Sequence, residues 1–153
     1  MKIILASKSG VRKEILKKNN FDCTVIPSGV DEDQVKDSLL AAGADPTLIS
    51  KNLAELKSIK VSNKNPDQLV LGADSVVSLN DEIINKPDSR EEALAILKKL
   101  NGSKHYLISS VCISKNGAMI WNYTDSSELV MKNMTDKELE EYLAKIKTET
   151  LLA

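Results

Sequence analysis

Apolar residues recur along the chain with two different periods. Short apolar runs, which are typical of buried strands, occupy residues 2–6, 21–26 and 69–79, and the last is the most apolar of them. Apolar residues three and four positions apart, as on one face of a helix, occur within residues 7–20 and again after Pro46. In the first of these helices the expected apolar face is Val11, Ile15 and Leu16, and in the second it is Ile49, Leu53 and Leu56. The pattern therefore predicts a chain that begins with alternating strands and helices.

Capping residues indicate where helices begin. Asp45-Pro46 opens a helix, because Asp is a favoured N-cap and Pro fits the first helical position. Ser89 and Thr135 are each followed three residues later by a glutamate, which is the sequence of a capping box. A further helix is expected around residues 34–42, inside a long polar connection.

Hairpin signals dominate the second half of the chain. A polar turn at 80–82 leads back into Ile83-Ile84, and a Lys115-Asn116-Gly117 turn joins longer strands at 106–114 and 119–131. Alternating strands and helices followed by a β-meander indicate an α/β or α+β fold with a mixed sheet.

Composition limits the classes of function. The chain has 153 residues, 42% hydrophobic and 28% charged, which is typical of one ordinary soluble domain. A net charge of −1 argues against a nucleic-acid polymer as partner, whereas a small phosphorylated ligand needs only a few local cations. The N-terminal apolar run is too short for a signal peptide or a membrane span, and Cys23 and Cys112 are expected as reduced core residues. These features predict a cytoplasmic protein that does not contact membranes.

The segment LASKSGVR places two serines and an arginine between a strand and a helix. A helix N-terminus offers free amides, hydroxyls add donors, and Arg12 adds a bidentate cation, so Ser7, Ser9 and Arg12 suit an anion. Taken alone, the same residues also fit a serine-capped helix with a solvent-exposed arginine.

Asp74 interrupts the apolar strand LVLGADSVVSL. A carboxylate there is costly to bury unless it is paired, hydrogen-bonded or metal-bound, and Gly72 allows a close backbone or ligand approach. The equally weighted alternative is a strand-end aspartate bonded to neighbouring backbone amides.

The other polar candidates are ambiguous one by one. Glu32 belongs to an acidic run that is by default a solvated loop, but beside Asp74 it would suit Mg²⁺ or Mn²⁺. Lys57 and Lys86 are by default surface lysines, and the single histidine, His105, is expected to be structural. The sequence contains no zinc-type Cys/His cluster, Walker A loop or dinucleotide fingerprint.

Six motifs read in order give a stronger signal than any one of them. They are LASKSGVR, VDED, LAELKSIKV, LGADSVV, IINKPDS and LNGSKHYLISSV. This series resembles the Maf family of nucleoside triphosphate pyrophosphatases, which are related in fold to the inosine triphosphate pyrophosphatases. The resemblance extends from Lys2 to about Tyr142.

The resemblance implies a fold, a reaction and a cofactor. The fold is α/β, with an elongated mixed sheet flanked by helices and a central cleft between two lobes. The reaction is hydrolysis of noncanonical or excess nucleotides to a nucleoside monophosphate and pyrophosphate, with Mg²⁺ or Mn²⁺. The nucleoside triphosphate is the implied partner, and a homodimer is compatible with the family.

The resemblance also implies roles for residues that match the family motifs. Asp74 is the catalytic residue, and Glu32 and Asp74 hold the metal. The substrate's phosphates are bound by Ser7, Ser9, Arg12, Lys57, Ser75 and Lys86. Gly10 and Val11 replace the Pro and first Arg of the family's first motif, so one cation is missing there.

Two further expectations concern the end of the chain and the loss of activity. Maf-like chains usually continue past the YL helix into an AGxY segment, so we expect residues 1–153 to form a single Maf-like domain truncated at its C-terminus. The alternative function is a catalytically impaired nucleotide-binding or interaction module linked to cell division. A weaker alternative is hydrolysis of another phosphoanhydride, such as that of a dinucleotide or a sugar nucleotide.

Overall fold

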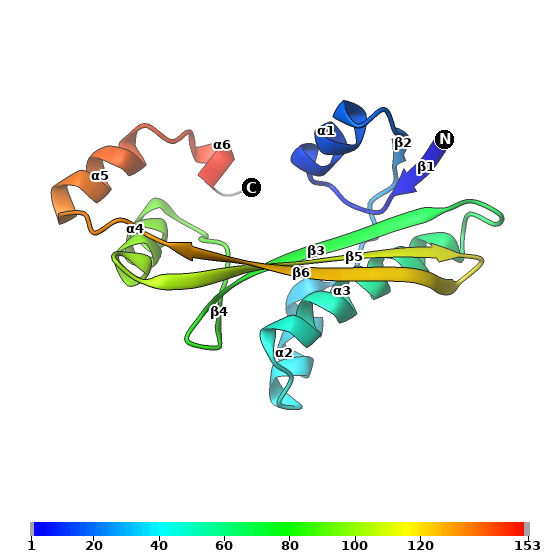
Figure 1. The fold of residues 1–153 in the computed structure, drawn as a ribbon, viewed down its shortest axis with the longest axis horizontal. Coiled ribbons are helices and arrows are strands. Elements are labelled where there is room, and N and C mark those ends of the chain that lie inside the picture. The colour runs from blue at the N-terminus through cyan, green and yellow to red at the C-terminus, as the bar shows by residue number, and fades with distance from the viewer. Residues whose placement is uncertain (1, 152–153) are drawn as a thin grey trace. The chain divides into compact units, whose positions relative to one another are not determined.

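The computed structural model describes residues 2–151 and contains a mixed sheet with helices on its faces (Figure 1). The strands are β1 (Lys2–Leu5), β2 (Asp22–Val25), β3 (Val70–Leu79), β4 (Glu82–Ile84), β5 (Lys104–Lys115) and β6 (Ala118–Val130). Their order is β2-β1-β3-β5-β6, and β4 also pairs with β3. β1 is parallel to β2 and β3, whereas β3 and β4 are antiparallel. The predicted α/β class with a mixed sheet is therefore confirmed.

The helices fall close to the predicted segments. They are α1 (Gly10–Lys18), α2 (Glu32–Ala41), α3 (Pro46–Ser62), α4 (Arg90–Leu100), α5 (Asp136–Ala144) and α6 (Thr148–Leu151). Asp45 caps α3 as predicted, and the capping box at Thr135 is complete. The box at Ser89 is not, because the Glu92 carboxylate accepts from the backbone N–H of Asp88, 2.7 Å away, and not from that of Ser89. No helix in residues 2–151 is long and apolar enough to cross a membrane.

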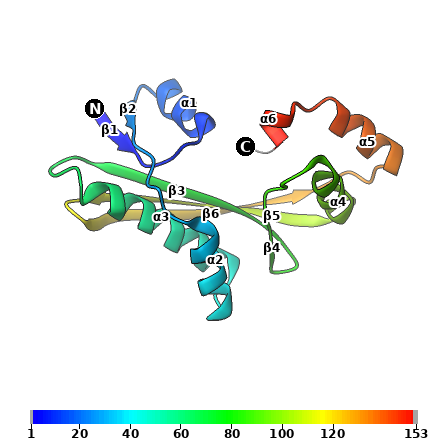
Figure 2. The same ribbon diagram turned by 180° about the vertical axis from the view of Figure 1, so that it is seen from behind.

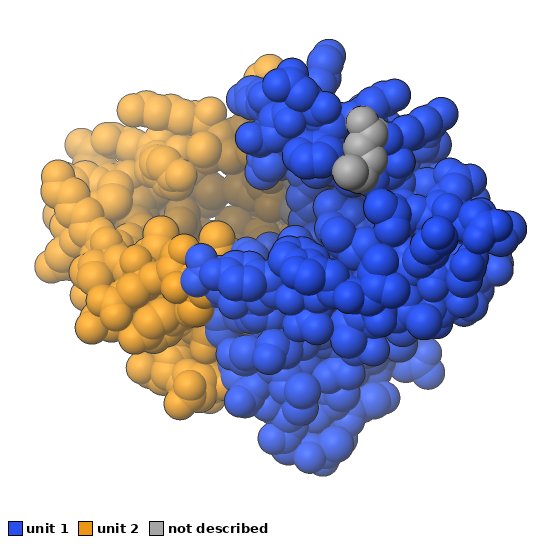
Figure 3. Space-filling model, turned by 45° about the vertical axis from the view of Figure 1, so that its right-hand side comes forward, with its two compact units in different colours: residues 1–75, 108–125 blue, residues 76–107, 126–153 orange. Residues whose placement is uncertain are grey.

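The chain divides into two compact units (Figure 3). Unit 1 comprises residues 1–75 and 108–125, and unit 2 comprises residues 76–107 and 126–153. Strands β3, β5 and β6 each run from one unit into the other. The single domain over 1–153 and the cleft between two lobes stay predictions.

In unit 1, α1 lies on one face of the sheet and α3 on the other (Figures 1 and 2). Ile4 and Ala6 pack against Val61 and Val70 in the core between the sheet and α3. The apolar face predicted for α1 is wrong as a buried face, because Val11 is 67% exposed. The helix instead contacts β2 and is tied to β3 by polar side chains, as described below.

Gly72 sets how closely α3 approaches β3. A Cβ atom at this position would collide with the carbonyl oxygen of Ala54 and lie 2.7 Å from the amide nitrogen of Ser58.

The apolar face predicted for α3 is correct at Ile49 and Leu53, which are fully buried, and wrong at its third residue. Leu56, expected in the core, is 44% exposed, and Lys57 is buried next to it.

In unit 2, Arg90 at the start of α4 holds the end of α5. Its guanidinium donates to the carbonyl oxygens of Leu143 at 3.1 Å and Ile146 at 2.6 Å. Because the last carbonyls of a helix lack partners within it, this arginine satisfies groups that would otherwise be unpaired.

Candidate active site

The two serines of the first motif have different local roles. Ser9 is the N-cap of α1, and its hydroxyl oxygen accepts from the backbone N–H of Arg12, with N and O 3.4 Å apart. The Ser7 hydroxyl oxygen accepts from the backbone N–H of Ser9 at 3.2 Å and from the Arg12 guanidinium at 3.0 Å. The capped-helix interpretation is therefore correct for Ser9 but does not account for Ser7 or Arg12.

Arg12 crosses from α1 to the middle of β3. Its guanidinium donates to the carbonyl oxygen of Ala73 at 3.1 Å and to the hydroxyl of Ser75 at 3.4 Å. The hydroxyl of Ser75 lies 3.0 Å from that of Ser109 on β5. The guanidinium hydrogen bonds to Ser7, Ala73 and Ser75 all go to neutral oxygen atoms. No carboxylate among them offsets its charge, which suits an anionic ligand.

Lys57 is buried, so the expectation of a solvated lysine is wrong. It is 4% exposed on α3, next to the close contact at Gly72. Its ammonium lies 2.8 Å from the Glu32 carboxylate and 2.9 Å from that of Asp74. It also donates to the carbonyl oxygen of Ala73 at 3.4 Å, the same atom that Arg12 contacts. The two cations therefore meet at one backbone oxygen of β3.

The acidic run of residues 31–33 is not a solvated loop. Asp31 is the N-cap of α2 and accepts from the backbone N–H of Gln34 at 3.1 Å. Glu32 is the first residue of α2, and its half-exposed side chain reaches Lys57. The preceding loop is anchored to α3 by Lys60, which donates to the carbonyl oxygen of Gly29 at 2.9 Å. The structure thus brings Glu32 and Asp74 to the same ammonium.

Asp74 is the most constrained acid of the group. It lies in the middle of β3 and is 4% exposed, so the strand-end interpretation is wrong. One carboxylate oxygen, Oδ1, accepts from Lys57, and the other, Oδ2, is buried without a hydrogen-bond partner in the described structure. Leaving such an atom unpaired is costly, so it is a natural point for a ligand to bind.

The carboxylates of Glu32 and Asp74 fit a hard metal ion only if other ligands complete its coordination. No group of three or more His, Cys, Asp or Glu side chains in residues 2–151 is arranged to hold a metal by itself. Mg²⁺ does not need such a cage, because it is commonly held by one or two carboxylates, waters and the phosphates of a substrate. Glu32, Asp74 and the unpaired Oδ2 therefore fit a divalent ion that arrives with a phosphorylated ligand.

Two residues predicted from the motifs lie outside unit 1. Lys86 is exposed in unit 2, in the segment after β4, and its role in binding stays a prediction. His105 is half-buried there, with Nδ1 3.4 Å from the carbonyl oxygen of Ser103, which fits the structural role expected for it.

Sequence reasoning assigned no role to two groups that contact the cluster. Ser109 pairs with Ser75, and it lies in the motif LNGSKHYLISSV, which gave no indication of this contact. The carbonyl oxygen of Ala73 accepts from both cations, and a backbone atom leaves no mark in the sequence.

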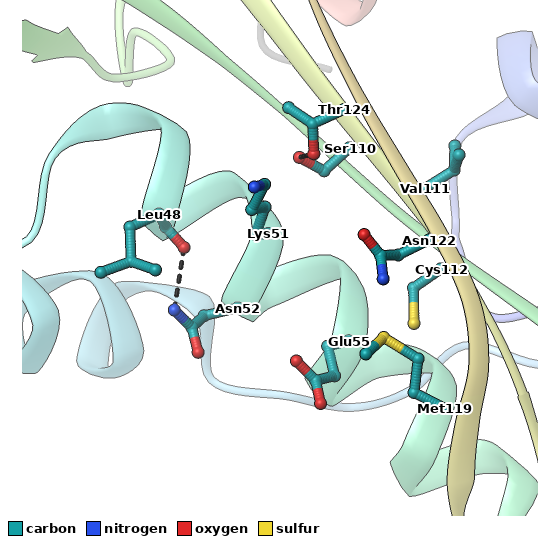
Figure 4. A pocket seen from close by; sticks show the side chains of 10 residues that line it. All are labelled: Leu48, Lys51, Asn52, Glu55, Ser110, Val111, Cys112, Met119, Asn122 and Thr124. Atoms are coloured by element: carbon teal, nitrogen blue, oxygen red, sulfur yellow. Dashed lines mark hydrogen bonds between the residues drawn. The ribbon is translucent and has the colours of Figure 1, made fainter.

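A pocket of about 220 Å³ also lies in unit 1, between α3 and the hairpin of β5 and β6 (Figure 4). Lys51 and Glu55 line it from α3, and Asn122 and Thr124 line it from β6. None of the residues predicted for the active site is among those that line it.

Comparison with known proteins identifies the family of the chain. The sequence profile of the family described as Maf-like protein matches residues 2–150. The chain belongs to the Maf-like family. A nucleoside triphosphate pyrophosphatase of Pelagibacter ubique is 63% identical over 151 residues, which are 99% of this chain and 77% of that protein. A 7-methyl-GTP pyrophosphatase of Brucella abortus is 34% identical over 146 residues, 95% of this chain and 73% of that protein.

Solved structures support the fold of this Maf-like chain. A HAM1 protein from Coxiella burnetii aligns with a TM-score of 0.51 over 84% of this chain and 71% of that one. At 15% identity this likeness concerns the fold alone.

Proposed function

We propose that this Maf-like chain hydrolyses nucleoside triphosphates between the α and β phosphates, releasing a nucleoside monophosphate and pyrophosphate. The observation that carries the proposal is that Arg12 and Lys57 meet at the carbonyl oxygen of Ala73. Lys57 also pairs with the carboxylates of Glu32 and Asp74, and Asp74 has a buried, unpaired oxygen. Phosphoanhydride hydrolysis needs cations for the phosphates and a base for water, and this cluster contains both. The names of the relatives point to the same reaction.

The phosphates would be held at the N-terminus of α1. A serine hydroxyl has one proton to donate and two lone pairs to accept with. The Ser7 oxygen accepts two hydrogen bonds, from Ser9 N–H and Arg12, so its own proton is left for a phosphate oxygen. Ser9 and Ser75 add hydroxyls beside it, and Arg12 supplies the charge. Lys86 is proposed as a further cation for the triphosphate.

Asp74 would act as the general base. Because Oδ1 is bonded to Lys57, the carboxylate is fixed in orientation, and one carboxylate oxygen of Asp74 would accept a proton from the attacking water. Burial keeps bulk water away from this atom, and a positioned base typically contributes about 10²–10⁴-fold to a rate.

A divalent ion, Mg²⁺ or Mn²⁺, would be held by Glu32 and Asp74. When bound, such an ion neutralises charge on the phosphates and makes the bound water more acidic. The protein's own contribution is to supply two hard oxygen ligands on α2 and β3 that Lys57 already holds at one place.

A cytoplasmic location and a homodimer belong to the same proposal. Nucleotide pools are cytoplasmic, and both cysteines are unpaired thiols, Cys112 in the core and Cys23 half-buried. Disulfides are rare in that compartment.

Product analysis tests the proposed reaction. The purified chain is incubated with Mg²⁺ or Mn²⁺ and a panel of pyrimidine, purine and 7-methylated triphosphates, and pyrophosphate and orthophosphate are measured separately. We expect pyrophosphate in equal amount to the monophosphate. Orthophosphate with a nucleoside diphosphate would contradict the cleavage position, and binding without turnover would favour the impaired-module alternative.

A further inference from the structure

The ammonium of Lys57 occupies a position that suits a metal ion. An ammonium has three N–H donors, and three oxygens surround this one, from Glu32, Asp74 and the carbonyl of Ala73. In the protein without ligand, both carboxylates that would hold the metal are thus already paired with one ammonium, which offsets one of their two charges. The lysine is 4% exposed, so this arrangement is a built part of the interior and not a chance surface pair.

The ammonium and a divalent ion compete for these oxygens. Mg²⁺ binds oxygen at about 2.0–2.1 Å and demands near-octahedral geometry. Glu32 Oε1 and Asp74 Oδ1 are already paired with the ammonium of Lys57, at 2.8 and 2.9 Å. A dication that bound the unpaired Oδ2 of Asp74 would lie within a few ångströms of the ammonium, and in a buried site this repulsion is weakly screened.

We propose that Lys57 is a resident counter-ion that holds Glu32 and Asp74 together until a divalent metal displaces it. Oδ2 of Asp74 is the atom at which the metal first binds. The freed ammonium then contacts the phosphates that arrive with the metal, a step that rests on the proposed function. Lys57 therefore opposes metal binding when no nucleotide is present, and it favours nucleotide binding once the metal has displaced it.

Removal of Lys57 changes the metal affinity in opposite directions if the lysine competes with the metal and if its role is purely structural. If Lys57 only positioned the acids, its removal would weaken metal binding, because the two carboxylates would no longer be held together. If it competes with the metal, its removal strengthens metal binding. The sign of one affinity change thus separates the two roles.

The test is a titration of the nucleotide-free full chain with Mn²⁺, in which free Mn²⁺ is followed by its paramagnetic resonance signal. Lys57→Met removes the charge and keeps an unbranched side chain that favours helix. Lys51→Met is the matched control, because Lys51 is an exposed lysine of the same helix and its loss changes the net charge equally. We expect Lys57→Met to bind Mn²⁺ at least about tenfold more tightly than the unmodified chain, and Lys51→Met to stay within about twofold since exposed charges are screened.

Equal or weaker binding by a folded Lys57→Met protein would overturn the inference and leave the proposed reaction standing. If neither protein bound Mn²⁺ at millimolar concentration, the inference would fail, whereas the product assay above would still judge the reaction and its metal requirement.

A measurement on the unmodified chain covers the case in which Lys57→Met does not fold. Acetic anhydride labels accessible lysines, and the extent at each is read by mass spectrometry. We expect Lys57 to be protected without metal and to become reactive in saturating Mn²⁺, while Lys51, as internal reference, is labelled equally in both conditions. A Lys57 that stays protected in saturating Mn²⁺ would overturn the inference.

Discussion

Lys57 donates to Asp74 over 2.9 Å, and both side chains are almost fully buried. The pair joins α3 to the middle of β3, where Gly72 lets the helix approach the strand. Removing one member of a buried ion pair leaves the other charge uncompensated, which typically costs about 3–5 kcal/mol. Here Lys57 has Glu32 as a second partner, so substitution of Asp74 is expected to cost less than substitution of Lys57.

Arg12→Ala should weaken triphosphate binding by about 1.5–3 kcal/mol, the scale of a hydrogen bond to a charged group. The helix should survive, because Ser9 and not Arg12 caps it and Ala is a good helix former. Calorimetric titration with a slowly hydrolysed triphosphate measures the effect. Lys13→Ala is the control, since Lys13 is the exposed neighbour on the same helix. Affinity losses of equal size in the two variants would show that Arg12 contributes only general charge.

Glu32→Gln should raise the Mg²⁺ concentration needed for half-maximal activity, because one hard oxygen ligand becomes a neutral amide. Asp33→Asn removes the same charge from the adjacent, exposed position of α2 and should leave the Mg²⁺ requirement unchanged. Activity is measured across a metal titration for both variants. Full activity of the unmodified chain in excess chelator would contradict metal dependence altogether.

Gly72→Ala should lower the free energy of unfolding by about 1–3 kcal/mol or more. The reason is that the added methyl group collides with the backbone of α3, where helix and strand are already in close contact. Gly10→Ala is the matched change, since nothing lies within 4 Å of a Cβ there. Denaturant unfolding gives the free energies of both variants. If the two were equally stable, the close approach of α3 to β3 would be wrong.

The sequence predicted the elements better than it predicted which faces are buried. Caps and turns are local: Asp45, Thr135 and the Asn116-Gly117 turn act within a few residues, so their positions follow from the pattern. Leu56 was predicted to be buried and Lys57 to be solvated, and both predictions were wrong. Burial on α3 depends on the side of the helix that packs against β3 at Gly72, which is distant in sequence.

The candidate site was predictable as residue types but not as contacts. Asp74 stood out because a carboxylate in an apolar strand needs a partner, and the motif series supplied the other residues. That Lys57 is the partner, and that Glu32 shares it, depends on how α2, α3 and β3 pack. The contacts to the Ala73 carbonyl come from backbone, which periodicity and motifs do not describe.

Pyrophosphate release by the unmodified chain and by Asp74→Asn, measured side by side with a saturating triphosphate and Mg²⁺, tests the central claim most directly. The amide keeps the shape of the side chain but loses the base and one charged metal ligand, so in saturating Mg²⁺ we expect the rate to fall by about 10²–10⁴-fold. Triphosphate affinity, measured by calorimetry on the same samples, should be largely retained. An Asp74→Asn protein that releases pyrophosphate at close to the unmodified rate would contradict the assignment of Asp74 as the base.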